Sequence, residues 1–120
     1  MKVMAILIIF ITMVFSPMLS QSQVYQLGSK WVETEGGIQG VWVRRGNTNI
    51  FDGKWENGAV AVLEMELNHN NVKIKRKDTG GPSAGWEITY EGTISSDGKT
   101  VKGTEWYPGG QAEWSARIER

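Results

Sequence analysis

The stretch WEITYEGTI, residues 86–94, alternates apolar or small residues with polar ones. Successive side chains of a β-strand point to opposite faces, so Trp86, Ile88 and Tyr90 would share one face and the Glu and Thr residues the other. Residues 112–118, AEWSARI, show the same alternation. One dry and one wet face is typical of an antiparallel sheet, so the pattern predicts an all-β domain.

Turn signals divide the rest of the chain. Asn57-Gly58 and Asp97-Gly98 are the clearest, because these residue types tolerate the positive φ of tight hairpin turns. The turns leave eight extended segments, at residues 29–34, 38–45, 48–56, 59–68, 72–78, 86–95, 100–107 and 111–119. We therefore predict an antiparallel meander of about eight short strands that closes into a small up-and-down barrel, with a β-sandwich or clam as the alternative. An eight-stranded interior is filled by side chains or holds one small ligand.

Glycine precedes tryptophan closely in three places, Gly40-Val41-Trp42, Gly53-Lys54-Trp55 and Gly85-Trp86. Together with the predicted meander over residues 29–119, these placements resemble the calycins, the lipocalin and avidin-type barrels. The resemblance implies a closed barrel that takes a small molecule. It is a likeness of architecture, since neither a biotin site nor a lipocalin signature is present, and it names no ligand.

The N-terminal segment has the composition of a secretory signal. Lys2 precedes an apolar run over residues 3–15, a length within the roughly 7–15 residues of a signal-peptide core. Pro17 then ends any helix, because proline lacks the N–H and crowds the preceding turn. The small residue Ser22 marks a cleavage position, so a signal peptide is predicted over residues 1–22.

An uncleaved membrane anchor over residues 3–19 is the alternative. This stretch is slightly shorter than the ~20 residues of a membrane-spanning helix. We therefore expect cleavage, a single all-β domain over residues 23–120, and a secreted or periplasmic protein. Membrane contact would arise only through residues 3–19 of an uncleaved chain.

Composition excludes several classes of function. The chain has no cysteine, so disulfides and thiolate metal sites are excluded. Without residues 1–22 it carries 12 Lys plus Arg against 13 Asp plus Glu, which gives no field to attract nucleic acid. The single histidine, His69, lies in an Asn-rich turn, and Asp97 has no second acidic residue close in sequence. We therefore predict no catalytic residue, no cofactor and no metal site, and an enzyme is the least favoured class.

Charged residues occur in the apolar phase of several segments. Arg44 shares a face with Trp42, Arg76 shares one with Val72 and Ile74, and Glu105 shares one with Val101. We predict that Arg44, Arg76, Glu105 and Tyr90 approach one interior or one rim. Because an unpaired buried charge is costly, these groups must pair with each other or with a ligand. An arginine among tryptophans would suit a small anionic ligand, whereas an Arg–Glu pair at the barrel ends is the alternative.

The tryptophans divide by phase. Trp42, Trp86 and Trp114 fall in the inward phase, where they form core or a ligand platform. Trp106 would point outward beside Tyr107, where it could stack on a sugar ring or enter a protein interface.

A basic cluster forms the wet face of the fifth segment. Alternation puts Lys73, Lys75 and Lys77 together on this face, and Glu64 and Glu66 on the preceding segment could face them. Cross-strand ion pairing that guards a sheet edge is the simpler interpretation. Recognition of an anionic polysaccharide or of lipid head groups is the alternative.

Two functions remain from the sequence. The first is an exported, non-enzymatic binding barrel for a small anionic or apolar molecule, with candidate ligand residues Arg44, Arg76, Tyr90, Trp42, Trp86, Trp114 and Glu105. The second is a structural or protein-interaction domain with a filled core, acting through Trp106 and Tyr107. Its partner would be another exported protein or a second copy of the chain.

Overall fold

The computed structural model describes residues 18–120. The predicted signal peptide and the alternative membrane anchor fall mainly on residues 1–17, outside the described residues. Within residues 18–120, no helix is both long and apolar enough for a membrane span.

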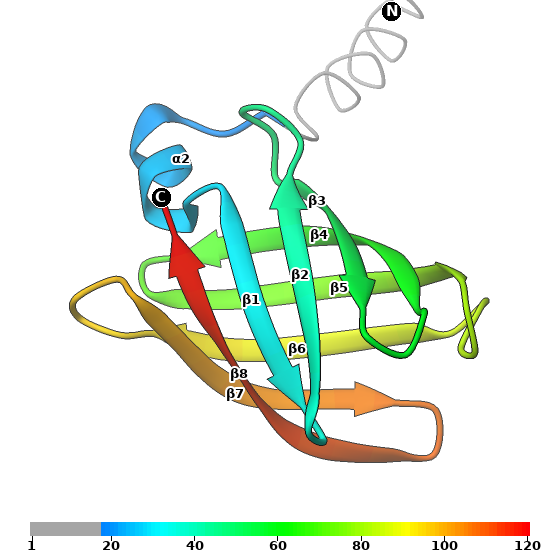
Figure 1. The fold of residues 1–120 in the computed structure, drawn as a ribbon. Helices are drawn as coiled ribbons and strands as arrows, with labels where there is room; N and C mark the ends of the chain where they lie inside the picture. Colours follow the sequence, from blue (N-terminus) through cyan, green and yellow to red (C-terminus); the bar gives the residue numbers. More distant parts are fainter. Residues whose placement is uncertain (1–17) are drawn as a thin grey trace, which may run out of the picture.

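Eight antiparallel strands form a closed barrel (Figure 1). One short helix, α2 (Gln21–Leu27), precedes β1 (Lys30–Glu35), β2 (Ile38–Arg44), β3 (Ile50–Trp55), β4 (Val60–Asn68), β5 (Asn71–Gly80), β6 (Glu87–Ile94), β7 (Thr100–Tyr107) and β8 (Gly110–Glu119). Each strand pairs with the next, and β1 pairs with β8, so the sheet has no free edge. The predicted all-β meander closing into a barrel is confirmed, and the sandwich alternative is not formed.

Helix α2 was not predicted, because seven residues are too few to show a helical stripe. The Ser20 hydroxyl accepts a hydrogen bond from the Gln23 N–H, and the Gln23 side chain accepts one from the Ser20 N–H, which makes a capping box. Leu27 is fully buried, and its carbonyl accepts a 2.7 Å hydrogen bond from Trp31 Nε1. The helix therefore covers one end of the barrel, called here the helix end (Figure 1). Cleavage after Ser22 would remove its N-cap.

The opposite end, called here the open end, carries the turns at residues 36–37, 56–59, 81–86 and 108–109. Alternate turns of an up-and-down barrel lie at the same end, so these four are neighbours in space.

Stacked aromatic rings fill the middle of the barrel. Trp31 and Trp42 are stacked with ring centroids 5.6 Å apart, and Trp42 and Trp114 with centroids 6.0 Å apart. Tyr90 meets the ring of Trp114 edge-on at 5.0 Å. Trp42 and Trp114 are buried, as their phase predicts. Because these rings occupy the interior, a ligand would have to bind toward an end of the barrel.

Trp55, whose phase the sequence leaves open, turns inward across two glycines. A Cβ atom on Gly40 would lie 2.4 Å from Trp55 Nε1, and one on Gly53 would lie 2.8 Å from Trp55 Cη2. Both distances are shorter than any ordinary contact, so the ring fits only because β2 and β3 carry no side chain there. Gly40 and Gly53 thus have a packing role, and the ring that crosses Gly40 is that of Trp55 rather than that of the neighbouring Trp42.

The basic face of β5 is paired across the sheet. Glu64 lies directly opposite Lys75, and Glu66 lies opposite Lys73. Lys77 forms a 3.4 Å ion pair with Glu87 on β6. The predicted facing of glutamates and lysines is confirmed, although among residues 18–120 only Lys77 of the three lysines forms an ion pair, and the closed barrel leaves no sheet edge to guard.

Gly40→Ala should destabilise the fold by about 1–3 kcal/mol, because the new methyl group collides with the Trp55 indole. Urea unfolding followed by tryptophan fluorescence measures this loss. Gly80→Ala is the matched control, since its Cβ would lie 3.8 Å from the nearest atom, an ordinary contact. Equal midpoints for the two variants would show that Trp55 does not require the glycine.

Candidate functional site

A cavity of about 390 Å³ opens at the open end of the barrel. Its volume lies within the roughly 300–1,000 Å³ typical of small-molecule sites. Its lining combines an apolar set, Ile38, Trp55, Trp86, Ile88, Tyr107 and Ala112, with three charged side chains, Glu35, Arg76 and Glu105. An apolar wall with a few convergent polar groups is the usual composition of a ligand pocket.

Arg76 is buried beside this cavity and paired with Asp78. Its Nε donates to Asp78 Oδ1 at 2.6 Å and its Nη2 donates to Oδ2 at 2.9 Å, which makes a bidentate pair. The two residues share a face of β5 because they are two positions apart. The guanidinium also lies over the Trp55 ring, with Cζ 3.7 Å from the ring centroid, a cation–π contact.

The remaining edge of the guanidinium reaches two other strands. Arg76 Nη1 donates to Glu35 Oε1 at 2.9 Å and to the Tyr90 hydroxyl at 2.7 Å. Burial alone would lower the pKa of Arg76, but the hydrogen bonds to Asp78 and the neighbouring charges raise it above its ordinary value. Arg76 is therefore a compensated cation, and its bidentate edge is not free for an anionic ligand.

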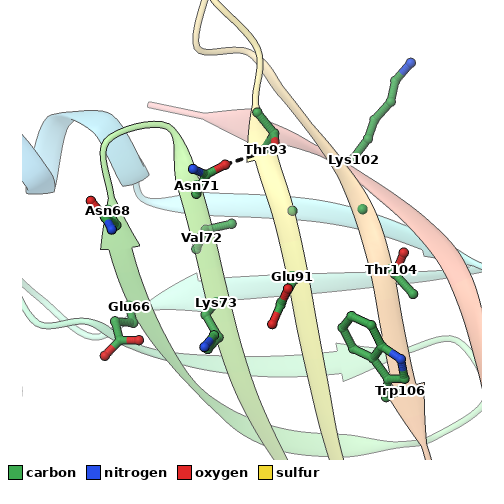
Figure 2. Close-up of a pocket in the computed structure, with 12 residues that line it drawn as sticks. Glu66, Asn68, Asn71, Val72, Lys73, Glu91, Thr93, Lys102, Thr104 and Trp106 are labelled. Carbon is green, nitrogen blue, oxygen red and sulfur yellow. Dashed lines mark hydrogen bonds between the residues drawn. The ribbon is translucent and has the colours of Figure 1, made fainter.

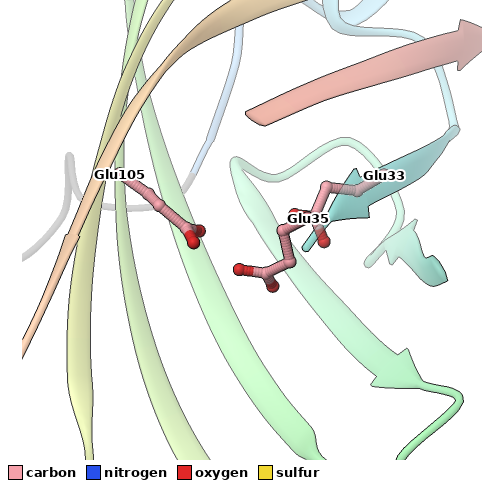
Figure 3. A group of neighbouring side chains, drawn as sticks. All are labelled: Glu33, Glu35 and Glu105. Carbon is pink, nitrogen blue, oxygen red and sulfur yellow. The ribbon is translucent and has the colours of Figure 1, made fainter. Parts of the chain in front are cut away.

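Three glutamates gather next to this pair. Glu33 and Glu35 come from β1 and Glu105 from β7, and Figure 3 shows their carboxyl groups pointing toward one another. One oxygen from each lies within 4.8 Å of the others. Trp55 Nε1 donates to Glu33 Oε1 at 2.6 Å and so orients that carboxyl group. We call these three residues the glutamate cluster.

Two oxygens of the glutamate cluster are buried without a partner. Among residues 18–120, neither Glu33 Oε2 nor Glu105 Oε2 has a hydrogen-bond partner. The residues are 0% and 4% exposed, respectively. Buried polar atoms nearly always have a hydrogen-bond partner. A bound donor or a cation would supply the partner that these two oxygens lack.

Burial has a strong effect on the acidity of the cluster. Desolvation, followed by the charge of Glu35, raises the pKa of Glu33 from 4.5 to about 8. Desolvation, followed by the neighbouring carboxyl group of Glu35, raises the pKa of Glu105 from 4.5 to about 9. At neutral pH and without a ligand, both groups therefore hold their protons.

The structure brings together three of the four charged or polar residues expected at one site. Arg76 and Glu105 line the cavity at the open end, and Tyr90, whose ring belongs to the aromatic core, reaches Arg76 through its hydroxyl. Arg44 lies elsewhere. Arg44 is the last residue of β2 and lies at the helix end, where it donates to the carbonyl oxygens of Gly28 (2.7 Å) and Gly46. The expectation for Arg44 is wrong because it rested on strand phase alone, whereas the turn after β2 lies at the opposite end of the barrel from the turn after β5.

The tryptophans of the proposed ligand platform separate in the same way. Trp42 and Trp114 belong to the aromatic core and do not line the cavity. Trp86 was expected to face inward, but it precedes β6 and is 42% exposed at the cavity mouth. The alternating sequence pattern begins at Trp86, but β6 begins only at Glu87. Trp86 therefore still belongs to the turn, and strand phase does not determine its direction.

Sequence reasoning missed Glu33, Glu35 and Trp55. The available signal was the alternation of Trp31, Glu33 and Glu35, the last of which lies one residue beyond the first predicted segment. This alternation puts two acidic residues in phase with a core tryptophan. Their meeting with Glu105 required knowledge of which end of each strand faces the others.

A second concavity lies on the outer face of the barrel, across β4 to β7 (Figure 2). Trp106 borders this concavity and is 38% exposed. Tyr107 follows the inward phase and packs against the core. Gly92 and Gly103 are register partners beneath this depression. Both lie in the inward phase, and a Cβ on Gly92 would lie 3.0 Å from Trp114 Cζ2 in the core. The two glycines therefore allow β6 and β7 to approach closely over the core.

Arg76→Leu should destabilise the protein by about 3–5 kcal/mol, because Asp78 would be left buried without its cation. Chemical denaturation measures this change. Arg45→Leu is the control, since Arg45 forms an exposed ion pair with Asp52 and its loss should barely move the midpoint. A stable Arg76→Leu protein would contradict the structural role assigned to Arg76.

The stability of the protein should fall as the pH rises from 5 to 9. The folded-state pKa values of Glu33 and Glu105, about 8 and 9, lie above their ordinary value of 4.5. Their contribution is therefore complete below about pH 4.5 and is lost as the pH rises through 8 and 9. The groups that face them are Glu35, Arg76 and Tyr90. Thermal melts in buffer containing EDTA measure the trend.

Glu105→Gln should flatten this pH dependence, because an amide has no proton to lose in that range. Glu113→Gln, an exposed position on β8, should keep the wild-type trend. Parallel curves for wild type and Glu105→Gln would show that the cluster does not hold its protons.

Comparison with known proteins gives no assignment. No protein-family model matches this chain, and no curated protein is similar to it in sequence. The eight-stranded antiparallel barrel is consistent with a calycin-like architecture. The function must therefore be inferred from the chemistry of the open end.

Proposed function

We propose that this chain is an exported, non-enzymatic binding protein that takes a small molecule in the cavity at the open end. The observation that carries the proposal is the cavity itself, about 390 Å³ with an apolar and aromatic wall and charged groups beside it. Export is supported by the composition of residues 1–22, a short basic start and an apolar run before a small-residue cleavage position.

The cavity wall favours a ligand with a flat or apolar body. Trp86 and Tyr107 border the opening together with Ile38 and Ile88. Aromatic faces bury large areas of ligand at a low cost in conformational entropy, since each side chain has few rotatable bonds. A molecule of about ten to twenty heavy atoms would fill a cavity of this size.

The polar part of the ligand should donate hydrogen bonds rather than accept them from Arg76. Four of the five guanidinium N–H groups are already directed at Asp78, Glu35 and Tyr90. The sequence left two ligand types open, anionic and apolar. The apolar type is therefore better supported. A hydroxyl or amino substituent on such a molecule would meet Glu105 or Glu35.

A second candidate function is supported by the outer face. The exposed Trp106, the glycine-lined depression beside it and the filled aromatic middle of the barrel suit a protein-interaction domain. Its partner would be another exported protein or a second copy of the chain. Native mass spectrometry distinguishes the two functions, because one predicts an added small mass and the other a multiple of the chain mass.

Trp86→Ala should lower retention of the co-purified or added ligand at least tenfold and leave folding intact, because Trp86 borders the cavity and is 42% exposed. The protein is expressed with its N-terminal segment, recovered after export and examined by native mass spectrometry. Trp106→Ala is the matched control, since that ring is 38% exposed but lies on the outer face.

Three results would contradict the small-molecule proposal. The first is a bare chain mass under gentle conditions together with no binding in a screen of small aromatic molecules. The second is equal ligand retention by Trp86→Ala and Trp106→Ala. The third is loss of ligand from Trp106→Ala alone. The last result would move the assignment to the outer face.

A further inference from the structure

We propose that Glu33, Glu35 and Glu105 form a binding site for one calcium ion beside the cavity. The site goes beyond the proposed small-molecule function and does not require it, because its ligands are supplied by the chain and by water. Figure 3 shows the three carboxyl groups converging from β1 and β7 on a common space.

The spacing of the oxygens suits calcium. One oxygen from each glutamate lies within 4.8 Å of the other two. Calcium binds oxygen at about 2.3–2.6 Å, and three oxygens at the 4.8 Å limit would lie about 2.8 Å from their common centre. A small rotation of the side chains, with no movement of the backbone, would therefore bring all three oxygens onto one calcium ion.

Unpartnered buried oxygens are a second, independent indication of a missing cation. Glu33 Oε2 and Glu105 Oε2 have no hydrogen-bond partner among residues 18–120, although both residues are more than nine-tenths buried. An acidic cluster on a protein surface would be satisfied by water. Here the carboxyl groups are withdrawn from solvent and still directed at one another, which a cation would compensate.

The neighbouring groups orient the cluster and do not repel a cation. Trp55 Nε1 holds Glu33 Oε1 at 2.6 Å, as partners of metal ligands commonly do. The nearest positive charge, Arg76, is matched by the bidentate carboxylate of Asp78. Glu35 Oε1 accepts a hydrogen bond from Arg76, so Glu35 Oε2 is the oxygen that would bind the ion.

The donor set selects a hard cation, and the tolerance of calcium for irregular coordination favours it among these. Every ligand is a carboxylate oxygen, and no histidine or cysteine belongs to the cluster, which disfavours zinc and copper. Magnesium binds oxygen at about 2.0–2.1 Å in a strict octahedron, so its coordination sphere spans only about 4.2 Å. Calcium accepts irregular coordination, and water from the cavity that Glu35 and Glu105 line completes its shell.

Calorimetry on the intact chain tests the site. The protein is stripped with EDTA, exchanged into chelator-free buffer at pH 8 and titrated with calcium chloride, since carboxyl groups must lose their protons to bind metal. We expect one calcium ion per chain with a Kd on the order of 10⁻⁴ to 10⁻³ M, the range of extracellular calcium modules. The melting temperature should rise by several degrees at 10 mM calcium and by less at 10 mM magnesium.

Matched glutamine variants distinguish calcium binding at the glutamate cluster from non-specific binding to other acidic residues. Glu105→Gln should weaken calcium binding at least tenfold, and Glu35→Gln, whose side chain is partly exposed, tests the same site with less risk to folding. Glu91→Gln, an exposed position on β6, should bind as wild type does. Circular dichroism confirms that each variant is folded before titration.

Three outcomes would overturn the calcium site. They are no binding heat and no thermal shift up to 10 mM calcium, an equal response to magnesium and calcium, and unchanged calcium affinity in both cluster variants. Because these titrations contain no organic ligand, their failure leaves the small-molecule proposal untouched. Loss of ligand in Trp86→Ala tests that proposal separately.

Discussion

The buried guanidinium of Arg76 is the constraint on which the open end depends. A charge withdrawn from water must be compensated on every side, so Arg76 determines where Asp78, Glu35 and Tyr90 place their polar atoms. It also needs a flat surface to lie on, which the ring of Trp55 provides. These contacts join β5 to β1, β3 and β6 through side chains in addition to the backbone ladders.

The position of Trp55 in turn depends on residues that have no side chain. Its indole crosses Gly40 and Gly53, which leave the space that any larger residue would fill. The same indole donates to Glu33, so one ring links the arginine pair to the glutamate cluster. Packing and electrostatics are coupled at this end of the barrel, and a change in either would be felt in the other.

Carboxyl groups outnumber cations at the open end. Glu33, Glu35, Glu105 and Asp78 surround a single guanidinium. The excess is carried by protons on Glu33 and Glu105, whose pKa values burial raises to about 8 and 9, or by a bound cation. Because the aromatic core fills the barrel middle, this end is where an interior ligand, an ion and water can all enter.

The sequence by itself determined the strands, their number and the inward position of most large residues, because alternation with period two is a local property that each segment carries alone. It also indicated that Arg76, Tyr90 and Glu105 lie on the dry face. The sequence did not predict helix α2 or the exposure of Trp86, because a seven-residue helix and a turn boundary leave no periodic signal. Only the tertiary structure decided which side chains meet across the interior. Arg44 and Arg76 look alike in phase, yet they lie at opposite ends because Arg44 precedes the turn between β2 and β3 and Arg76 the turn between β5 and β6. The meeting of Glu33 with Glu105 likewise follows from closure of β1 onto β8, a contact between distant parts of the chain that no local pattern encodes.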